Sequence, residues 1–282
     1  MGSPLLATCR LLSYLVFTVA LMPVQATVLA IGWHRASVGL PRFYHRCCAW
    51  MLGFIVEQRG MRATGPATLF VVNHCSYLDI TLLGAAVPGS FIAKAEVARW
   101  PLFGWLAKLQ RTVFVERERR TRAAAQRDEV TRRLEAGDSL ILFPEGTSSD
   151  GNRILPFKTA LFSVAERRID GHAIVVQPVT IAYVRLDGMP IGHALRPLFA
   201  WYGDMDMAGH IWRAAGLGDC TVSIEFHPPV TIEAFGSRKA LAEHCRAVIS
   251  EGMTRAITGR WPDAAPPRPA PPELPARPAE AI

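Results

Sequence analysis

The sequence lacks the spacing patterns by which cysteine and histidine bind metal ions. Its six cysteines form no Cys-x-x-Cys pair and have no histidine at zinc-ligand spacing, so we expect reduced thiols in a protein that faces the cytosol. We predict no metal site and no cofactor. No DNA- or RNA-binding signature is present, and nucleic acid is therefore not an expected partner. A Gly-x-Ser-x-Gly turn is also missing, which disfavours a serine hydrolase.

Formal charge is absent from residues 11–33, although the chain carries a net charge of +7. As a helix this segment would be about 35 Å long, enough to cross a hydrocarbon layer of about 30 Å. Pro23 and Gln25 interrupt the segment and permit a kinked or re-entrant helix instead of a straight span. A signal peptide cleaved after Ala26 is the alternative, but the apolar run continues beyond that residue.

A second apolar segment, residues 47–56, follows a stretch that contains Arg35, Arg42 and Arg46, and it is too short to span a bilayer. Two apolar segments separated by basic residues predict a membrane-associated helical hairpin over residues 1–60. The remaining domain would then lie at the cytosolic face of the inner or cytoplasmic membrane. A basic, apolar-rich chain suits an anionic lipid surface.

Short β-branched runs alternate with helical patterns between residue 64 and about residue 229, which predicts an α/β domain over residues 61–260. The Pro- and Ala-rich residues 261–282 are expected to be a disordered tail. Predicted strands cover residues 69–72, 90–93, 112–115, 139–143, 174–180 and 221–226. Predicted helices cover residues 119–136, closed by Gly137, and 237–257.

A histidine follows the first of these strands. Residues 69–72 read as a strand buried on both faces, which would hold His74 on a rigid support. Ser76 is the expected N-cap of the next helix, with Asp79 in its first turn. A His-Asp pair of this kind fixes the imidazole tautomer and leaves one ring nitrogen as a general base. A helix-capping acid beside an ordinary loop histidine is the alternative.

Two other strands also end in polar residues. Alternation along residues 111–117 places Phe114 on one side of the strand and Arg117 at its exit. The turn Pro144-Glu145-Gly146 places Glu145 at the end of another strand. Ligands bind at the carboxyl ends of strands in α/β sheets, so the three strand ends together predict a site. Taken singly, Arg117 reads as part of a solvated basic run and Glu145 as a turn acid.

These motifs, in this order, resemble the glycerolipid acyltransferases typified by 1-acylglycerol-3-phosphate acyltransferase. The four family blocks correspond to Asn73, His74 and Asp79 of NHxxxxD, to Phe114 and Arg117, to Phe143–Thr147 of FPEGT, and to Val176–Val179 with Pro178. The resemblance implies a single α/β domain with a mixed sheet flanked by helices. It covers residues 69 to 229.

The resemblance also implies an activity. His74 would take the proton from a lysolipid hydroxyl, which attacks the thioester of acyl-carrier protein or acyl-CoA, and Asp79 would orient the imidazole. No covalent enzyme intermediate is implied, and the lipid bilayer would supply the acyl chains. The implied substrate-binding residues are Asn73, Phe114, Arg117, Glu145, Gly146, Thr147 and Lys158.

Departures from the family pattern bear on the acceptor. The third block usually continues with Arg-Ser, whereas this chain has Ser148 and Ser149, and a serine cannot replace the paired donors that a guanidinium offers to a phosphate. The string FPEGTSSDGNRILPFK, with the later WYGDMDM, is similar to the branch that acylates lyso-ornithine lipid. Lysophosphatidic acid is the alternative acceptor, with Arg111, Arg153 or Lys158 supplying the cation. A non-catalytic membrane adaptor on the same fold is a further alternative.

Overall fold

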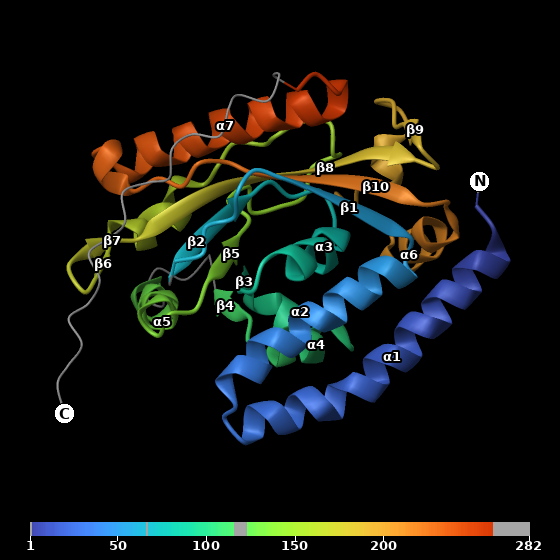
Figure 1. Ribbon diagram of the computed structural model, residues 1–282, viewed down its shortest axis with the longest axis horizontal. Helices are drawn as coiled ribbons and strands as arrows, with labels where there is room; N and C mark the ends of the chain where they lie inside the picture. Colours follow the sequence, from blue (N-terminus) through green and yellow to red (C-terminus); the bar gives the residue numbers. More distant parts are fainter. Residues whose placement is uncertain (1, 66, 116–122, 262–282) are drawn as a thin grey trace.

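The computed structural model describes residues 2–65, 67–115 and 123–261, and its central element is an eight-stranded mixed sheet between helices (Figure 1). The sheet strands are β1 (Phe54–Arg59), β2 (Thr68–Val72), β3 (Ser90–Lys94), β4 (Val113–Val115), β5 (Leu140–Leu142), β8 (Val175–Leu186), β9 (Met189–Pro190) and β10 (Cys220–Phe226). A separate two-stranded sheet contains β6 (Arg168–Ile169) and β7 (His172–Ala173). All six predicted strands are present, with ends shifted by a few residues.

Helices lie on both faces of the sheet. The α-helices are α1 (Pro4–Ala30), α2 (His34–Met51), α3 (Leu78–Ala86), α4 (Phe103–Leu109), α5 (Ala123–Glu135), α6 (Met207–Gly216) and α7 (Arg238–Thr258). Short 3-10 helices are η1 (Ala95–Arg99), η2 (Thr159–Glu166), η3 (Arg196–Leu198) and η4 (Ile232–Ala234). In Figure 1, α7 covers one face of the sheet and α2, α3 and α4 cover the other, with α1 outermost. The α/β prediction and the helix predicted over residues 237–257 are confirmed, as is the described part of the helix predicted over residues 119–136, whose residues 119–122 lie outside the described residues.

Strand β2 is buried along its whole length because both of its faces are covered. Phe70 and Val72 pack in the cluster that includes α3, whereas Leu69 and Val71 pack in the cluster that includes α5 and α7. Burying an aliphatic or aromatic side chain contributes about 1.5 to 3 kcal/mol, so this short strand is strongly anchored. It therefore gives the residues that follow Val72 a rigid support.

The order of strands explains why distant motifs meet. The sheet runs β1-β10-β8-β2-β5-β3-β4, and β2 is parallel to both β5 and β8. Val71 lies opposite Leu142 in the β2–β5 register, so the residues after both strands emerge at one edge. Strand β10 is antiparallel to β8, which makes the sheet mixed.

The N-terminal residues form two antiparallel helices, α1 and α2 (Figure 1). Helix α1 is long and apolar enough to cross a membrane, with a mean hydropathy of 1.9 over an 18-residue window. The predicted second apolar segment is different in the structure. Residues 47–51 end α2, which also contains the arginines expected to separate the two segments, and residues 54–59 form β1 beside β10.

The chain leaves α2 and enters the sheet through Gly53, whose φ of 79° lies in the left-handed region that favours glycine. Phe54 and Val56 then face the core, while Ile55 is exposed. The sheet therefore begins before residue 60, where the sequence prediction had ended the N-terminal segment. Arg117 and the predicted tail at 262–282 lie outside the described residues.

Polar contacts attach α1 to the rest of the protein at both ends. Arg10 donates to the carbonyl of Leu217 at 2.7 Å and to Asp219 at 2.8 Å, beyond the last turn of α6. Near the other end, Gln25 Nε2 donates to the carbonyls of Ser37 and Leu109. The Ser37 carbonyl has no helical partner because Pro41, four residues on, has no N–H. Helix α1 is therefore fixed against α2, α4 and α6.

Candidate active site

His74 and Asp79 form the predicted pair at the carboxyl end of β2. His74 Nδ1 lies 2.8 Å from Asp79 Oδ2, and Asp79 is fully buried. The same oxygen accepts from the backbone N–H groups of Cys75 at 2.8 Å and Ser76 at 2.9 Å. An oxygen that already accepts from two backbone N–H groups is an acceptor toward the imidazole as well, so Nδ1 carries the ring proton. The lone pair is then on Nε2, the nitrogen that a general base uses.

The start of α3 differs slightly from the predicted capping pattern. The helix begins at Leu78, with Tyr77 in the N-cap position, while Ser76 Oγ accepts from the Leu78 N–H at 3.3 Å. Asp79 does lie in the first helical turn, as predicted, and folds back onto the residues that precede the helix. This turn brings a carboxylate five residues beyond His74 against the imidazole.

Tyr183 is a third member of the site that the sequence analysis missed. Its hydroxyl donates to Asp79 Oδ1 at 2.8 Å from strand β8. The side chain is 1% exposed, and burial raises the pKa of Tyr183 far above its usual value, so the hydroxyl remains a donor. Alternation along β8 could have indicated it, because Val179, Ile181 and Tyr183 all face the cluster that contains α3.

The imidazole of His74 is also held by an aromatic ring. Phe143, directly after β5, stacks on it with ring centroids 4.1 Å apart and an interplanar angle of 21°. The His74 side chain is 21% exposed. Among the described residues, no group forms a hydrogen bond with Nε2. The ring is thus fixed by Asp79 and Phe143 while the basic nitrogen remains accessible.

Glu145 supports the backbone of the site. Its Oε1 accepts from the His74 N–H and its Oε2 from the Leu155 N–H, both at 2.8 Å. The side chain is 2% exposed, and burial raises the pKa of Glu145 to about 7 against the opposing effect of these two hydrogen bonds. Both carboxylate oxygens are used within the protein. Glu145 therefore joins the end of β2 to the loop after β5.

Asn73 has a similar role on the other side of β2. Its Nδ2 donates to the Ile181 carbonyl and its Oδ1 accepts from the Ile181 N–H, both at 2.9 Å. This two-point contact fixes the separation between the end of β2 and β8, next to the His-Asp pair. The amide contacts backbone, whereas the sequence analysis expected Asn73 to bind substrate.

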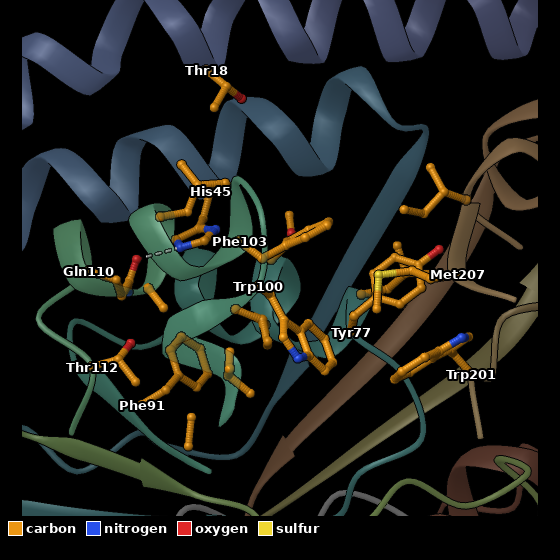
Figure 2. A pocket seen from close by; sticks show the side chains of 18 of the residues that line it. Thr18, His45, Tyr77, Phe91, Trp100, Phe103, Gln110, Thr112, Trp201 and Met207 are labelled. Atoms are coloured by element: carbon orange, nitrogen blue, oxygen red, sulfur yellow. Dashed lines mark hydrogen bonds between the residues drawn. The ribbon is translucent and has the colours of Figure 1, made fainter. Parts of the chain in front are cut away.

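A cavity of about 480 Å³ adjoins His74. Figure 2 shows its largely apolar wall, to which Phe91, Trp100 and Phe103 contribute from β3 to α4, and Tyr77 and Trp201 from the opposite side. Helices α1 and α2 close the remaining side. A cavity of this size with apolar walls suits a hydrocarbon chain.

The cavity separates the predicted site residues into two groups. His74, Gly146 and Thr147 line it, whereas five others do not: Asn73, Asp79, Phe114, Glu145 and Lys158. Arg117 lies outside the described residues. Within residues 2–65, 67–115 and 123–261, no three His, Cys, Asp or Glu side chains are grouped as a metal-binding set.

The three cations considered as replacements for the missing family arginine do not line the cavity either. Arg111 forms a two-point ion pair with Asp138, at 2.9 and 3.2 Å. Arg153 is exposed and lies 3.8 Å from Asp150. Of the described residues that line the cavity, one cation, Lys94, and one carboxylate, Glu96, lie at the end of β3 and in η1.

The mixed sheet agrees with comparisons to known proteins. The chain belongs to the acyltransferase family. The family model described as Acyltransferase matches residues 54–182, and acyltransferases that are 44% and 36% identical to this chain match it over most of both lengths. It is 44% identical to a lyso-ornithine lipid O-acyltransferase of Brucella abortus, over 86% of this chain and 92% of that protein. It is 31% identical to a 1-acyl-sn-glycerol-3-phosphate acyltransferase of Neisseria gonorrhoeae, over 67% and 72%.

A solved structure shares the fold. The crystal structure of the 1-acyl-sn-glycerophosphate (LPA) acyltransferase from Thermotoga maritima superposes with a TM-score of 0.56 at 22% identity, over 90% of this chain and all of that one. The resemblance and the fold class inferred from the sequence are confirmed. The protein is an enzyme of acyl transfer.

Proposed function

We propose that this protein is a membrane-bound O-acyltransferase that moves a fatty acyl group from acyl-carrier protein or acyl-CoA to the free hydroxyl of lyso-ornithine lipid. The hydroxyl oxygen attacks the thioester carbonyl carbon, a C–O bond forms and the C–S bond breaks. The proton passes from the hydroxyl to His74 Nε2 and from there to the leaving thiolate. The products are an ester and a free thiol, and the histidine returns to its starting state.

The contacts of the dyad support His74 in this role. Asp79 holds the proton of the imidazole on Nδ1, and its carboxylate stabilises the imidazolium that forms during transfer. Tyr183 and the N–H groups of Cys75 and Ser76 keep that carboxylate in place. The cavity next to Nε2 gives the acyl chain an apolar environment.

The surface of α1 supports the membrane location. Leu12, Leu15, Val16 and Val19 are exposed on this helix, and only 11% of its most apolar window is buried. A lipid bilayer would cover these side chains and deliver acyl chains to the cavity wall that α1 forms. The domain would then lie on the cytosolic side, where acyl-carrier protein and acyl-CoA are present.

One observation carries the choice of acceptor: the described cavity wall offers a cation and an anion together, Lys94 and Glu96. The head group of lyso-ornithine lipid is zwitterionic, so its carboxylate can pair with Lys94 and its ammonium with Glu96. A phosphate acceptor would gain from Lys94 but would be repelled by Glu96. The serine at position 148, in place of the usual family arginine, points the same way.

A competition assay tests the acceptor. Purified protein in mixed micelles receives labelled acyl thioester with equal amounts of lyso-ornithine lipid and lysophosphatidic acid, and we expect ornithine lipid as the main product. Glu96→Gln should raise the KM for lyso-ornithine lipid alone, whereas Lys94→Met should raise the KM for both acceptors. Phosphatidic acid as the main product of the wild type would refute the assignment.

Lysophosphatidic acid is the second candidate, favoured by the similarity to the Neisseria enzyme. Under that assignment Glu96→Gln would increase the use of lysophosphatidic acid, since a repulsive charge is removed, and Lys94→Met would abolish it. The effect of Glu96→Gln on the KM for lyso-ornithine lipid therefore separates the candidates. Free fatty acid released without any acceptor would instead indicate a hydrolase.

A further inference from the structure

His45, on α2, is a buried polar side chain in the largely apolar wall of the cavity (Figure 2). It is 6% exposed. The imidazole lies against Gly84 of α3, where an added Cβ would come within 2.4 Å of the ring, so the fold makes room for it by having glycine there. The ring is therefore a built feature of the cavity wall, separate from the catalytic His74.

The contacts of His45 fix its tautomer. Gln110 Nε2 donates to the Gly89 carbonyl at 3.3 Å, which turns Gln110 Oε1 toward His45 Nε2 at 2.7 Å. Nε2 must then carry the proton and Nδ1 the lone pair. Burial lowers the pKa of His45 to about 4, so the ring is neutral at physiological pH. Nδ1 is buried and has no hydrogen-bond partner among the described residues.

Gln25 of α1 lines the same cavity and has a second acceptor that lacks a donor among the described residues. Its Nε2 uses both hydrogens on the carbonyls of Ser37 and Leu109, so the remaining polar atom, Oε1, can only accept. Oε1 is also buried without a partner in the described part of the chain. Two buried acceptors that lack donors are unfavourable next to a plain hydrocarbon. A hydroxyl on a ligand has one hydrogen to donate and would satisfy one of the two.

We propose that the cavity selects an acyl chain that carries a hydroxyl group along its length, and that this hydroxyl donates to His45 Nδ1. The inference rests on the proposed function only in that the cavity holds an acyl chain. The hydroxyl in question is distinct from the one that reacts at His74. It belongs either to the thioester donor or to the acyl chain of the lysolipid, and His45 acts as a specificity residue for it.

Binding to the His74→Ala protein tests the inference without turnover. Fatty acids of equal length, plain or with one hydroxyl at successive carbons, compete with a fluorescent fatty acid for the cavity. We expect one hydroxyl position to bind about five- to tenfold more tightly than the plain chain, the effect of one neutral hydrogen bond to a buried acceptor. Equal affinities at every position would mean that only water satisfies Nδ1, and would overturn the proposal.

Two substitutions separate the nitrogen atoms of His45. His45→Asn can place an oxygen near the position of Nδ1 but loses the N–H toward Gln110, whereas His45→Gln keeps an N–H near the position of Nε2 and loses the acceptor. The preference for the hydroxylated chain should survive in His45→Asn and disappear in His45→Gln. His172→Gln, at an exposed histidine of β7, is the control and should match the unsubstituted protein.

If His45 had a purely structural role, His45→Asn and His45→Gln would behave alike, and the preference for the hydroxylated chain would be the same in both. If neither variant folds, the scan of hydroxyl positions still decides the question. Turnover assays with the wild type then assign the source, by moving the hydroxyl from the donor chain to the lysolipid chain. Absence of transfer to any lysolipid would defeat the proposed function but not the binding preference, so the two failures are distinguishable.

Discussion

The backbone N–H of His74 donates to Glu145 Oε1 at 2.8 Å, although the two residues are 71 positions apart in the chain. The other oxygen of the same carboxylate accepts from Leu155. One buried acid thus joins the strand that presents the base to the loop that lines the cavity. Both oxygens of Glu145 are used within the protein, and the contact with the His74 N–H fixes the position of that residue.

Replacing the base should remove activity without removing the protein from the membrane. His74→Ala is expected to lower kcat by a factor of about 10² to 10⁴, which is the usual contribution of a general base. Asp79→Asn should cost less but still orders of magnitude, because an amide can hold the wrong tautomer of His74. Acyl transfer and vesicle flotation are measured side by side, with His172→Ala as control. Near-wild-type transfer by His74→Ala would disprove the mechanism.

Tyr183→Phe tests the support of the carboxylate. The change removes the hydroxyl donor of Asp79 Oδ1, which is left with the weak thiol contact of Cys75 at 3.7 Å. A hydrogen bond to a charged group contributes about 1.5 to 3 kcal/mol, so both kcat and the free energy of unfolding should fall. Steady-state kinetics and chemical denaturation give the two values. Unchanged results in both would show that the contact has no energetic role.

Glu145→Gln should change how stability depends on pH. Burial raises the pKa of Glu145 from 4.5 to about 7, so between these values the folded protein keeps a proton that the unfolded chain has lost. The contribution of Glu145 to the free energy of unfolding is therefore full below pH 4.5 and falls by about 3 kcal/mol as pH rises to 7. Glutamine cannot titrate, so the variant lacks this fall.

Chemical denaturation at several pH values measures the unfolding free energy of wild type and variant under identical conditions. The unfolding free energy of the wild type minus that of the variant should fall as pH rises from 4.5 to 7. Glu251→Gln, at an exposed position of α7, should give a curve parallel to that of the wild type. Parallel curves for Glu145→Gln as well would rule out the raised pKa.

Ser148→Arg should shift the acceptor preference toward lysophosphatidic acid. Ser148 lines the cavity and donates to the Trp201 carbonyl, so an arginine there adds paired donors for a phosphate. A desolvated charge-assisted pair is worth about 1.5 to 3 kcal/mol, which predicts a shift of roughly tenfold to a hundredfold. Ser148→Ala removes the contact with Trp201 without adding charge and is the matched control. An equal shift in both variants would exclude the cation as the cause.

Deleting α1 should separate the protein from lipid. Removal of residues 2–32 takes away the exposed apolar helix and one wall of the cavity, so vesicle binding and activity on long-chain acceptors should both be lost. Arg10→Met weakens the attachment to α6 but keeps the apolar surface, and it should still bind vesicles. If the protein without residues 2–32 remained fully active on vesicles, α1 would be dispensable.

Local patterns in the sequence predicted the strand ends and allowed a contact between His74 and Asp79, which the family resemblance then favoured over a capping acid beside a loop histidine. A run of five apolar and β-branched residues can be buried only between two layers, and the residue after such a strand is therefore presented at the edge of the sheet. The five-residue spacing allows a first-turn carboxylate to reach back to the imidazole. These relations depend on neighbours in the chain, so the sequence alone carries them.

Long-range partners depended on the tertiary structure. Tyr183 meets Asp79, and Asn73 meets Ile181, only because β8 pairs with β2, a choice that hydrophobic patterning leaves open. The same pairing directs side chains expected to bind substrate toward backbone groups. Residues 54–56 were predicted as the end of the apolar segment 47–56, yet they begin the edge strand β1 because β10 offers unpaired backbone groups there.

The cavity is a property of the assembled layers. Its wall combines α1, α2, α3, α4 and α6 with the sheet, and no single segment shows that His45 and Gln25 face the same space. Among the residues that the structure describes, their acceptors have no partners because Gln110, Ser37 and Leu109 use the opposite atoms, which only the packed helices determine. The sequence thus determined which chemistry the strand ends present. The tertiary structure decided what that chemistry contacts, because packing sets the distances between residues far apart in the chain.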